Sequence, residues 1–218
     1  MNQDFWISRW NENKIGFHQQ TVNAVMREYL PTLGLAPGAR IFVPLCGKSL
    51  DMLWLRDQGY QVLGVELSRL AAEAFFEENN LPVEKESQGK FLRFHSGPVE
   101  ILCGDFFDLR REHLAGATGV YDRAALIALP QPMRARYAQH LSTILGPEAH
   151  ILLITIEYPA HEMNGPPFTV LEEEVRDLFA GKFDMELLRT DDVLDAEPRF
   201  RDRGLTELRE KVFRLKKQ

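Results

Sequence analysis

The segment IFVPLCGKSLDM, residues 41–52, decides how the rest of the chain is interpreted. Its first part, Ile41–Leu45, is apolar at consecutive positions, which is typical of a strand buried on both faces of a parallel sheet. Gly47 then permits a tight turn, and Ser49 is a candidate cap for the next helix, with Asp51 in its first turn. This strand–turn–helix pattern predicts the first unit of an open α/β sheet, with a ligand site at the turn.

Short apolar runs alternate with amphipathic segments between Arg40 and Tyr158, as expected for repeated strand–helix units. The apolar runs predict strands at Ile41–Leu45, Val62–Val65, Val99–Cys103, Gly119–Tyr121 and Ile151–Ile156. Apolar stripes and capping residues predict helices over Thr21–Leu30 (ended by Pro31), Leu50–Gln58, Ser68–Asn79, Pro132–Leu145 and, after a Thr169/Glu172 capping box, up to Gly181.

The end of the chain has a different pattern, because no long helix separates its two strand-like runs, Phe183–Arg189 and Leu208–Leu215. They predict an antiparallel pair at one edge of the sheet, and Lys90–His95 predicts a hairpin with Val99–Cys103. The predicted fold class is therefore α/β: a doubly wound, mostly parallel sheet with helices on both faces and an antiparallel C-terminal edge. We expect one domain over residues 1–218, with a helical lid segment at 1–34 and a cofactor-binding core at 35–218.

Composition narrows the class of partner. The 218 residues include 26 Lys plus Arg against 32 Asp plus Glu, a net charge of −6, which disfavours nucleic acid as a partner. The longest apolar runs are far shorter than the ~20 residues of a membrane span, and the N-terminus lacks a signal-peptide pattern. We therefore expect a cytoplasmic protein, without a disulfide framework for its two cysteines and without a metal site for its scattered histidines.

Acidic residues after the next strands complete a nucleoside-like pattern. Glu66 ends the second strand, 19 residues after Gly47, where a carboxylate can accept hydrogen bonds from ribose hydroxyls. Asp105 follows the third strand, where it can meet an adenine amino group beside Phe106 as a stacking wall. Gly47 alone could be an ordinary turn glycine, and Glu66 alone could be a surface carboxylate. The spacing of the three residues taken together favours an adenosine pocket.

The kind of turn selects among adenosine ligands. A phosphate-binding P-loop needs a glycine five positions before Gly47, where the sequence has Phe42, and a dinucleotide site needs further glycines. A turn with one glycine suits a ligand without a pyrophosphate, so we expect S-adenosylmethionine as the cofactor. Cys46 in this turn has no evident base and is expected to be a packing residue rather than a nucleophile.

Several motifs along the whole chain resemble bacterial members of the thiopurine S-methyltransferase family. They are FWISRW at 5–10, GFH at 16–18, VPLCGKSLDM at 43–52, VELS at 65–68, YDRAAL at 121–126 and GPPF at 165–168. The resemblance implies the Rossmann-like class I methyltransferase fold and an S-methyltransferase that acts on aromatic or heterocyclic thiols such as thiopurines. It also implies activity on selenium or tellurium species in metalloid detoxification, and a monomer.

The resemblance assigns roles to particular residues. It places Trp10, Leu45, Glu66 and Arg123 at the cofactor, with Gly47 in the turn and Asp105 and Phe106 beside the adenine, and it places Phe17 and Arg199 at the substrate. The loop at 165–168 is interpreted as a gate with Phe168 against the substrate, and a stiff structural loop is the alternative.

Arg123 is the expected catalytic residue, because it follows the fourth strand and can stabilise charge on a thiolate or heterocyclic nitrogen. The structural alternative for Arg123 is a buried ion pair with Asp122 or a neighbour. No general base is assigned, and His18 is favoured as a structural helix-start residue over a proton acceptor. Two other functions stay open from the residues alone: a nicotinamide-dependent oxidoreductase and a noncatalytic adenosine-ligand sensor.

Overall fold

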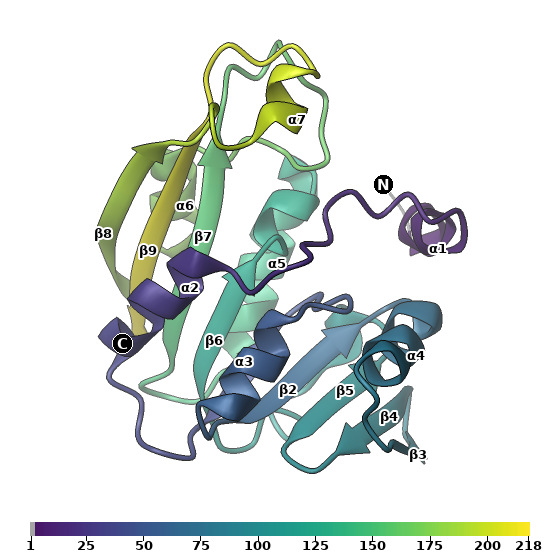
Figure 1. Ribbon diagram of the computed structural model, residues 1–218. Helices are drawn as coiled ribbons and strands as arrows, with labels where there is room; N and C mark the ends of the chain where they lie inside the picture. The colour runs from purple at the N-terminus through teal and green to yellow at the C-terminus, as the bar shows by residue number, and fades with distance from the viewer. Residues whose placement is uncertain (1–2) are drawn as a thin grey trace.

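The predicted parallel strands form the centre of a nine-stranded sheet in the computed structural model, which describes residues 3–218 (Figure 1). β5, β2, β1, β6 and β7 run parallel to one another, and antiparallel strands extend the sheet at both edges. In order across the sheet, the strands are β3 (Glu84–Gln88), β4 (Phe91–Ser96), β5 (Val99–Cys103), β2 (Gln61–Glu66), β1 (Arg40–Val43), β6 (Ala117–Arg123), β7 (His150–Glu157), β9 (Arg209–Lys217) and β8 (Phe183–Asp192). The predicted fold class is confirmed, including the antiparallel C-terminal edge.

Helices cover both faces of the sheet. Figure 1 shows α2, α3 and α4 in front of it and α5 and α6 behind it, with α1 on the right above α4 and α7 above β7 and β9. The helices are α1 (Gln3–Asn11), α2 (Ala24–Tyr29), α3 (Asp51–Asp57), α4 (Arg69–Glu78), α5 (Gln131–Ile144), α6 (Glu172–Phe179) and α7 (Pro198–Arg201), with short 3-10 turns η1 (Leu30–Leu33), η2 (Phe106–Asp108) and η3 (Leu126–Ala128).

Two apolar layers explain why the central strands are apolar at consecutive positions. Successive side chains of a strand point to opposite faces, so Ile41 packs with the α2–α4 layer and Phe42 with the α5–α6 layer. Both side chains are fully buried. The same alternation separates Leu152 from Leu153 on β7. A sheet covered on both faces therefore leaves the carboxyl ends of its parallel strands as the open edge where a ligand can enter.

Two predicted helix boundaries differ from the structure. α2 begins at Ala24 because Asn23 caps it, its side chain accepting a hydrogen bond from the backbone N–H of Met26 at 2.8 Å. Pro31 does not end the helical segment, since it occupies the first turn of η1, where a missing N–H costs nothing. The prediction for Ser68 is confirmed: its hydroxyl accepts from the backbone N–H of Ala71 at the start of α4.

The predicted capping box at Thr169 and Glu172 is wrong. α6 begins after Leu171, and the backbone N–H of Glu172 donates instead to Glu157 on β7, at 2.6 Å. The Glu172 carboxylate pairs with Arg176 and with Lys211 on β9. The carboxylate of Glu157 on β7 thus accepts from the start of α6, a long-range contact that local spacing cannot reveal. Ser49, the other predicted cap, accepts a 3.3 Å bond from Asp51 but does not cap α3.

The edge strand β3 was not expected from the sequence. Its residues, Glu84–Gln88, are all polar and all exposed, so they carry neither an apolar run nor an apolar alternation. β3 forms because its backbone pairs with β4, opposite Phe91 and Phe94 in the register. Charged residues on an exposed edge also discourage pairing with other chains.

A substitution at Gly64 on β2 would test how tightly the sheet packs against the turn that follows β1. A Cβ at this position would lie 2.6 Å from Sγ of Cys46 and 3.3 Å from Cγ1 of Ile101. We expect Gly64→Ala to lower the free energy of unfolding by about 1–3 kcal/mol, because both neighbours are held in the core. Urea unfolding would measure this. Gly146→Ala is the matched control, since nothing lies within 4 Å of its Cβ position, and an equal loss there would contradict the prediction.

Candidate active site

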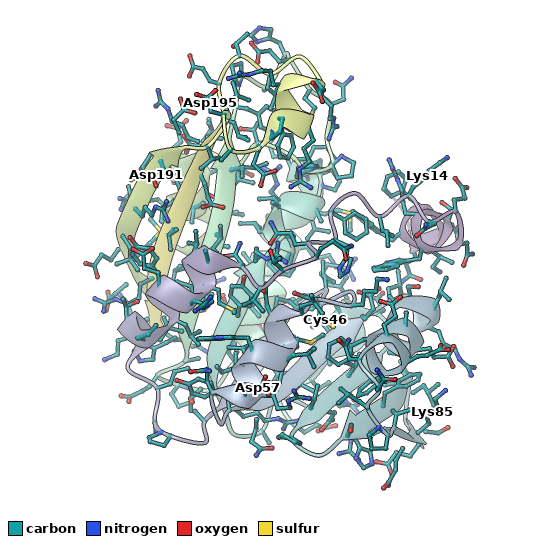
Figure 2. All side chains as sticks on the ribbon, viewed as in Figure 1. Lys14, Cys46, Asp57, Lys85, Asp191 and Asp195 are labelled. Atoms are coloured by element: carbon teal, nitrogen blue, oxygen red, sulfur yellow. The ribbon has the colours of Figure 1, made fainter. Side chains whose placement is uncertain are left out.

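A cavity of about 660 Å³ lies where the strand order reverses, with β2 on one side of β1 and β6 on the other. In open α/β sheets this switch point is where ligands bind. Figure 2 labels Lys14 beside α1 and Asp195 beside α7, which mark the two segments on either side of this edge, and Cys46 below them. The predicted site residues that line the cavity are Trp10, Phe17, Leu45, Gly47, Glu66, Asp105, Phe106, Arg123 and Arg199.

The turn after β1 presents its backbone to the cavity. Leu45 and Gly47 both have positive φ angles, of 46° and 54°, a conformation that is costly for leucine and easy for glycine. A Cβ on Gly47 would lie 3.2 Å from the Trp10 ring, so the indole covers the turn closely. Ala124, at the end of β6, also has a positive φ, of 72°. Strained backbone at both strand ends is a common feature of functional sites.

Glu66 holds the turn in place from the end of β2. Its Oε2 accepts from the backbone N–H of Gly47 at 2.8 Å, and its Oε1 accepts from the N–H of Ser68 at 2.7 Å. Burial raises the pKa of this carboxyl, while these backbone donors oppose the shift by favouring the charged form. Each oxygen keeps a second lone pair, so the carboxylate can also accept from a ribose hydroxyl.

Arg123 is oriented by a buried carboxylate rather than left free. Its Nε donates to Oδ2 of Asp51 at 3.0 Å, and the same oxygen accepts from the Tyr121 hydroxyl at 2.9 Å. Oδ1 of Asp51 accepts from the backbone N–H of Asn23 at 2.8 Å. Asp51 is 1 % exposed, so these three donors replace the water that its charge would otherwise need.

The proposed ion pair between Arg123 and Asp122 is not formed, although a neighbour, Asp51, takes that place. Asp122 and Arg123 are consecutive on β6 and therefore point to opposite faces of the sheet. Asp122 instead accepts from the Tyr137 hydroxyl at 2.6 Å and from the backbone N–H of Leu126. Arg123 thus combines a structural ion pair with a place on the cavity wall.

Asp105 and Phe106 lie at the cavity with unequal exposure. Asp105 caps η2, and its Oδ2 accepts from Nε2 of Gln3 at 2.7 Å, which joins α1 to the core. Phe106 is 3 % exposed and stacks on Tyr137 with ring centroids 4.8 Å apart. Phe106 therefore belongs to the α5–α6 core layer and presents only a small part of its ring to a ligand.

The substrate side contains Phe17 and Arg199 but not Phe168. The Phe17 ring meets Trp10 and Trp6 edge-on, with centroids 5.5 and 5.9 Å apart. Arg199 donates from Nη1 to the carbonyl of Gly16 at 2.6 Å, so the α7 region reaches the lid segment.

Phe168 does not line the cavity, because its ring packs against Gly165 and lies beneath the Arg134 guanidinium. Pro166 and Pro167 take the expected place of Phe168 at the wall.

The two cysteine thiols near the turn are not activated as nucleophiles. Burial raises the pKa of Cys46 well above its ordinary value and that of Cys103 to about 11, so both stay neutral thiols at neutral pH. His18 does not line the cavity, and burial lowers its pKa.

Among residues 3–218, no group of three or more His, Cys, Asp or Glu side chains is placed to hold a metal ion. No helix in this part of the chain is long and apolar enough to cross a membrane.

Sequence reasoning missed residues that contribute to the site from other elements. Asp51 was interpreted only as a helix-start carboxylate, because its partners Tyr121 and Arg123 are about 70 positions away. Ile154, Ile156 and Glu210 also line the cavity from β7 and β9. No local signal pointed to Glu210, because it lies between Arg209 and Lys211 among the charged residues at the start of the 208–215 strand.

Solved structures that share this fold include methyltransferases. A Burkholderia thailandensis 1,6-didemethyltoxoflavin-N1-methyltransferase, solved with S-adenosylhomocysteine, superposes with a TM-score of 0.62 at 18% identity, covering 99% of this chain and 87% of its own. A SAM-dependent methyltransferase from Anabaena variabilis gives a TM-score of 0.65 at 16% identity, over 100% and 96% of the two chains. These likenesses define the fold as that of the S-adenosylmethionine-dependent methyltransferases.

Sequence comparison identifies the family. The family model for thiopurine S-methyltransferase (TPMT) matches residues 1–218. The thiopurine S-methyltransferase of Nitrosospira multiformis is 50% identical over 215 residues, 99% of this chain and 98% of its own, and that of Bordetella petrii is 47% identical over the full length of both. The chain belongs to the thiopurine S-methyltransferase family. It is a methyltransferase with S-adenosylmethionine as its cofactor, as the sequence predicted.

Asp122 gives the fold a pH dependence that can be measured. Burial raises the pKa of Asp122 to about 6, so between pH ~4 and ~6 the folded protein holds a proton that the unfolded chain has lost. Unfolding releases this proton, and the free energy of unfolding should fall by about 2–3 kcal/mol as the pH rises through that window. Asp122→Asn should remove this contribution while keeping partners for Leu126 and Tyr137. Urea unfolding at several pH values would measure both proteins, and parallel curves would contradict the prediction.

Proposed function

We propose that the chain transfers the methyl group of S-adenosylmethionine to the sulfur of aromatic or heterocyclic thiols, thiopurines among them. The observation that supports this most is one continuous cavity with two different walls. The turn at Leu45–Gly47 and Glu66 form the wall toward β1 and β2. Aromatic, aliphatic and proline side chains with a few arginines form the wall toward the lid segment and α7.

The first wall fits the adenosine part of the cofactor. Glu66 is fixed by two backbone donors and retains lone pairs for two neighbouring hydroxyls. The positive φ angles of Leu45 and Gly47 turn the backbone toward the cavity, and the missing Cβ of Gly47 leaves the indole of Trp10 close to it. Aromatic faces such as Trp10 can also attract a sulfonium charge.

The second wall suits a flat, apolar ring. Trp6 and Phe17 come from the lid segment, Pro166 and Pro167 from the loop after β7, and Phe200 from α7. Such a wall excludes water and leaves the ring few orientations, which favours thiols on aromatic or heterocyclic rings over small polar thiols.

The chemistry demands mainly positioning. When bound, the cofactor supplies a methyl group already activated by a sulfonium charge. The walls hold the substrate sulfur on line with that group, an effect that can be worth ~7–11 kcal/mol. Arg123, fixed by Asp51, stabilises negative charge on the thiolate or on a ring nitrogen. Exclusion of water strengthens these interactions, because opposite charges meet in a medium of low dielectric constant.

The family resemblance extends the proposal to selenium and tellurium species, which are soft nucleophiles like a thiolate, and hence to metalloid detoxification. We also propose a monomeric protein in the cytoplasm, on the composition and motifs of the sequence. The family assignment favours a methyltransferase over the oxidoreductase and the noncatalytic sensor.

A methyl-transfer assay across thiopurines, thiophenols, selenite and tellurite tests the substrate class. Methylation of none of these compounds would contradict the proposed function.

Glu66→Ala tests the cofactor wall. The variant loses the ribose acceptor and the bonds to Gly47 and Ser68, so S-adenosylmethionine and S-adenosylhomocysteine should bind more weakly by ~1–3 kcal/mol. Titration calorimetry measures both affinities. Glu78→Ala is the control. Glu78 is an exposed residue of α4 that pairs with Lys48 of the turn, and it does not line the cavity. Equal affinities for wild type and Glu66→Ala would contradict the assignment.

Arg123→Ala tests the charge-stabilising role. We expect kcat/KM for aromatic thiols to fall by about 10²–10³, the usual effect of removing a transition-state donor. Arg123→Lys keeps the charge but loses the planar fork that meets Asp51 and should recover only part of the rate. Methyl-transfer kinetics measure the effect, with Arg56→Ala, whose partner is Asp57 away from the cavity, as the control. Unchanged turnover and cofactor affinity would exclude the role.

A further inference from the structure

We propose that Glu210 is the general base of the reaction and takes the proton of the substrate thiol, an inference that rests on the proposed function. Glu210 lies on β9 and lines the cavity. It has no part in the cofactor wall or in the network around Arg123, and neither the family motifs nor the apolar pattern had pointed to it.

The register of β7 and β9 places Glu210 on the floor of the cavity. Glu210 pairs with Ile156 and Val212 pairs with Ile154, so these side chains share one face of the sheet. Leu208, two positions before Glu210, projects to the same face. Ile154, Ile156, Leu208 and Glu210 all line the cavity, and Glu210 therefore stands at the border of an otherwise aliphatic floor.

Arg123 lies on the same face at the other side of that floor. It pairs with Ile154 in the register of β6 and β7, while Glu210 is next to Ile156 on the far side of β7. A ring that lies over the two isoleucines would therefore have a guanidinium at one side and a carboxylate at the other. This arrangement can both accept a proton and stabilise the anion that remains.

Glu210 is free to accept a proton because its charged neighbours are already engaged. Arg189 and Asp191 on β8 pair with each other, Glu197 pairs with Arg199 at 2.9 Å, and Arg123 pairs with Asp51. Within residues 3–218, the Glu210 carboxylate has no hydrogen-bond or ion-pair partner.

Burial raises the pKa of Glu210, as do the charges of Glu197 and Asp191, while Arg189 and Arg123 lower it. A carboxylate without a partner and with a raised pKa is a better base than an exposed one.

The proton transfer balances without another reactant. The S–H bond of the thiol breaks, its proton goes to a carboxylate oxygen of Glu210, and its electron pair stays on sulfur. That pair forms the new S–C bond as the methyl carbon leaves its sulfonium, which keeps the pair of the broken bond and becomes a neutral thioether. Glu210 returns the proton to solvent when the products leave.

Substrates of different acidity separate this role from simple binding. Glu210→Gln should lower kcat/KM by about 10²–10⁴ for a weakly acidic thiol such as phenylmethanethiol, the usual contribution of a general base. The electron-poor 5-thio-2-nitrobenzoate, already ionised at neutral pH, should react unchanged or faster. Glu207→Gln, an exposed residue paired with Arg209, is the matched control and should leave both rates unchanged. Equal losses for both thiols, or none, would overturn the proposal.

A binding measurement gives a second readout without turnover. Titration calorimetry of 5-thio-2-nitrobenzoate into the S-adenosylhomocysteine complex, in buffers of different ionisation heat, counts the protons exchanged. The wild type should take up close to one proton, because a bound thiolate next to Glu210 requires that carboxyl to be protonated; Glu210→Gln should take up none. Equal proton uptake by the wild type and Glu210→Gln would overturn the proposal. Wild type that binds S-adenosylhomocysteine yet methylates neither thiol would instead contradict the proposed function.

Discussion

The buried carboxylate of Asp51 is the interaction on which the active site most depends. It joins the first residue of α3 to Tyr121 and Arg123 on β6 and to the N–H of Asn23, the cap of α2. A charge with 1 % exposure is tolerated only when all its neighbours are in place, so these three parts of the chain assemble together. The position of Arg123 at the cavity therefore follows from the packing of the α2–α3 layer on the sheet.

The two walls of the cavity have different origins in the chain. Consecutive strand–helix units of the sheet, from β1 to β6, form the wall proposed for the cofactor, and Glu66 holds its turn through hydrogen bonds from the backbone N–H groups of Gly47 and Ser68. The wall proposed for the substrate comes from Trp6 and Phe17 and from the region from Pro166 to Glu210, which are far apart in the sequence. Changes in the second wall can alter the substrate while the first keeps its geometry, as expected where one fold serves many acceptors.

Local chemistry explains which features could be predicted from the sequence. Strand β1 and the cap at Ser68 depend on neighbouring residues, and the sequence displays them directly, although β1 ends at Val43 and not at Leu45 as predicted. The spacing from Gly47 to Glu66 is likewise read directly from the sequence. The partners of Asp51, the cap of α6 by Glu157 and the place of Glu210 depend on strand order, which brings distant residues together. Edge strand β3 escaped prediction because its stability comes from β4 rather than from its own side chains.

The position of β9 in the chain has a consequence for the completion of the fold. β9 inserts between β7 and β8, so the strand made last fills an interior place in the sheet and adds the final part of the cavity floor. The turn after β1 and Glu66 precede β6 in the chain, whereas Leu208 and Glu210 reach the cavity floor beside Ile154 and Ile156 only with the last strand. Without this strand β8 would lose its neighbour in the sheet, and both core layers would lose buried side chains: Val212 from one, Phe213 and Leu215 from the other. The last residues of the chain therefore complete the fold at the same time as they complete the cavity floor.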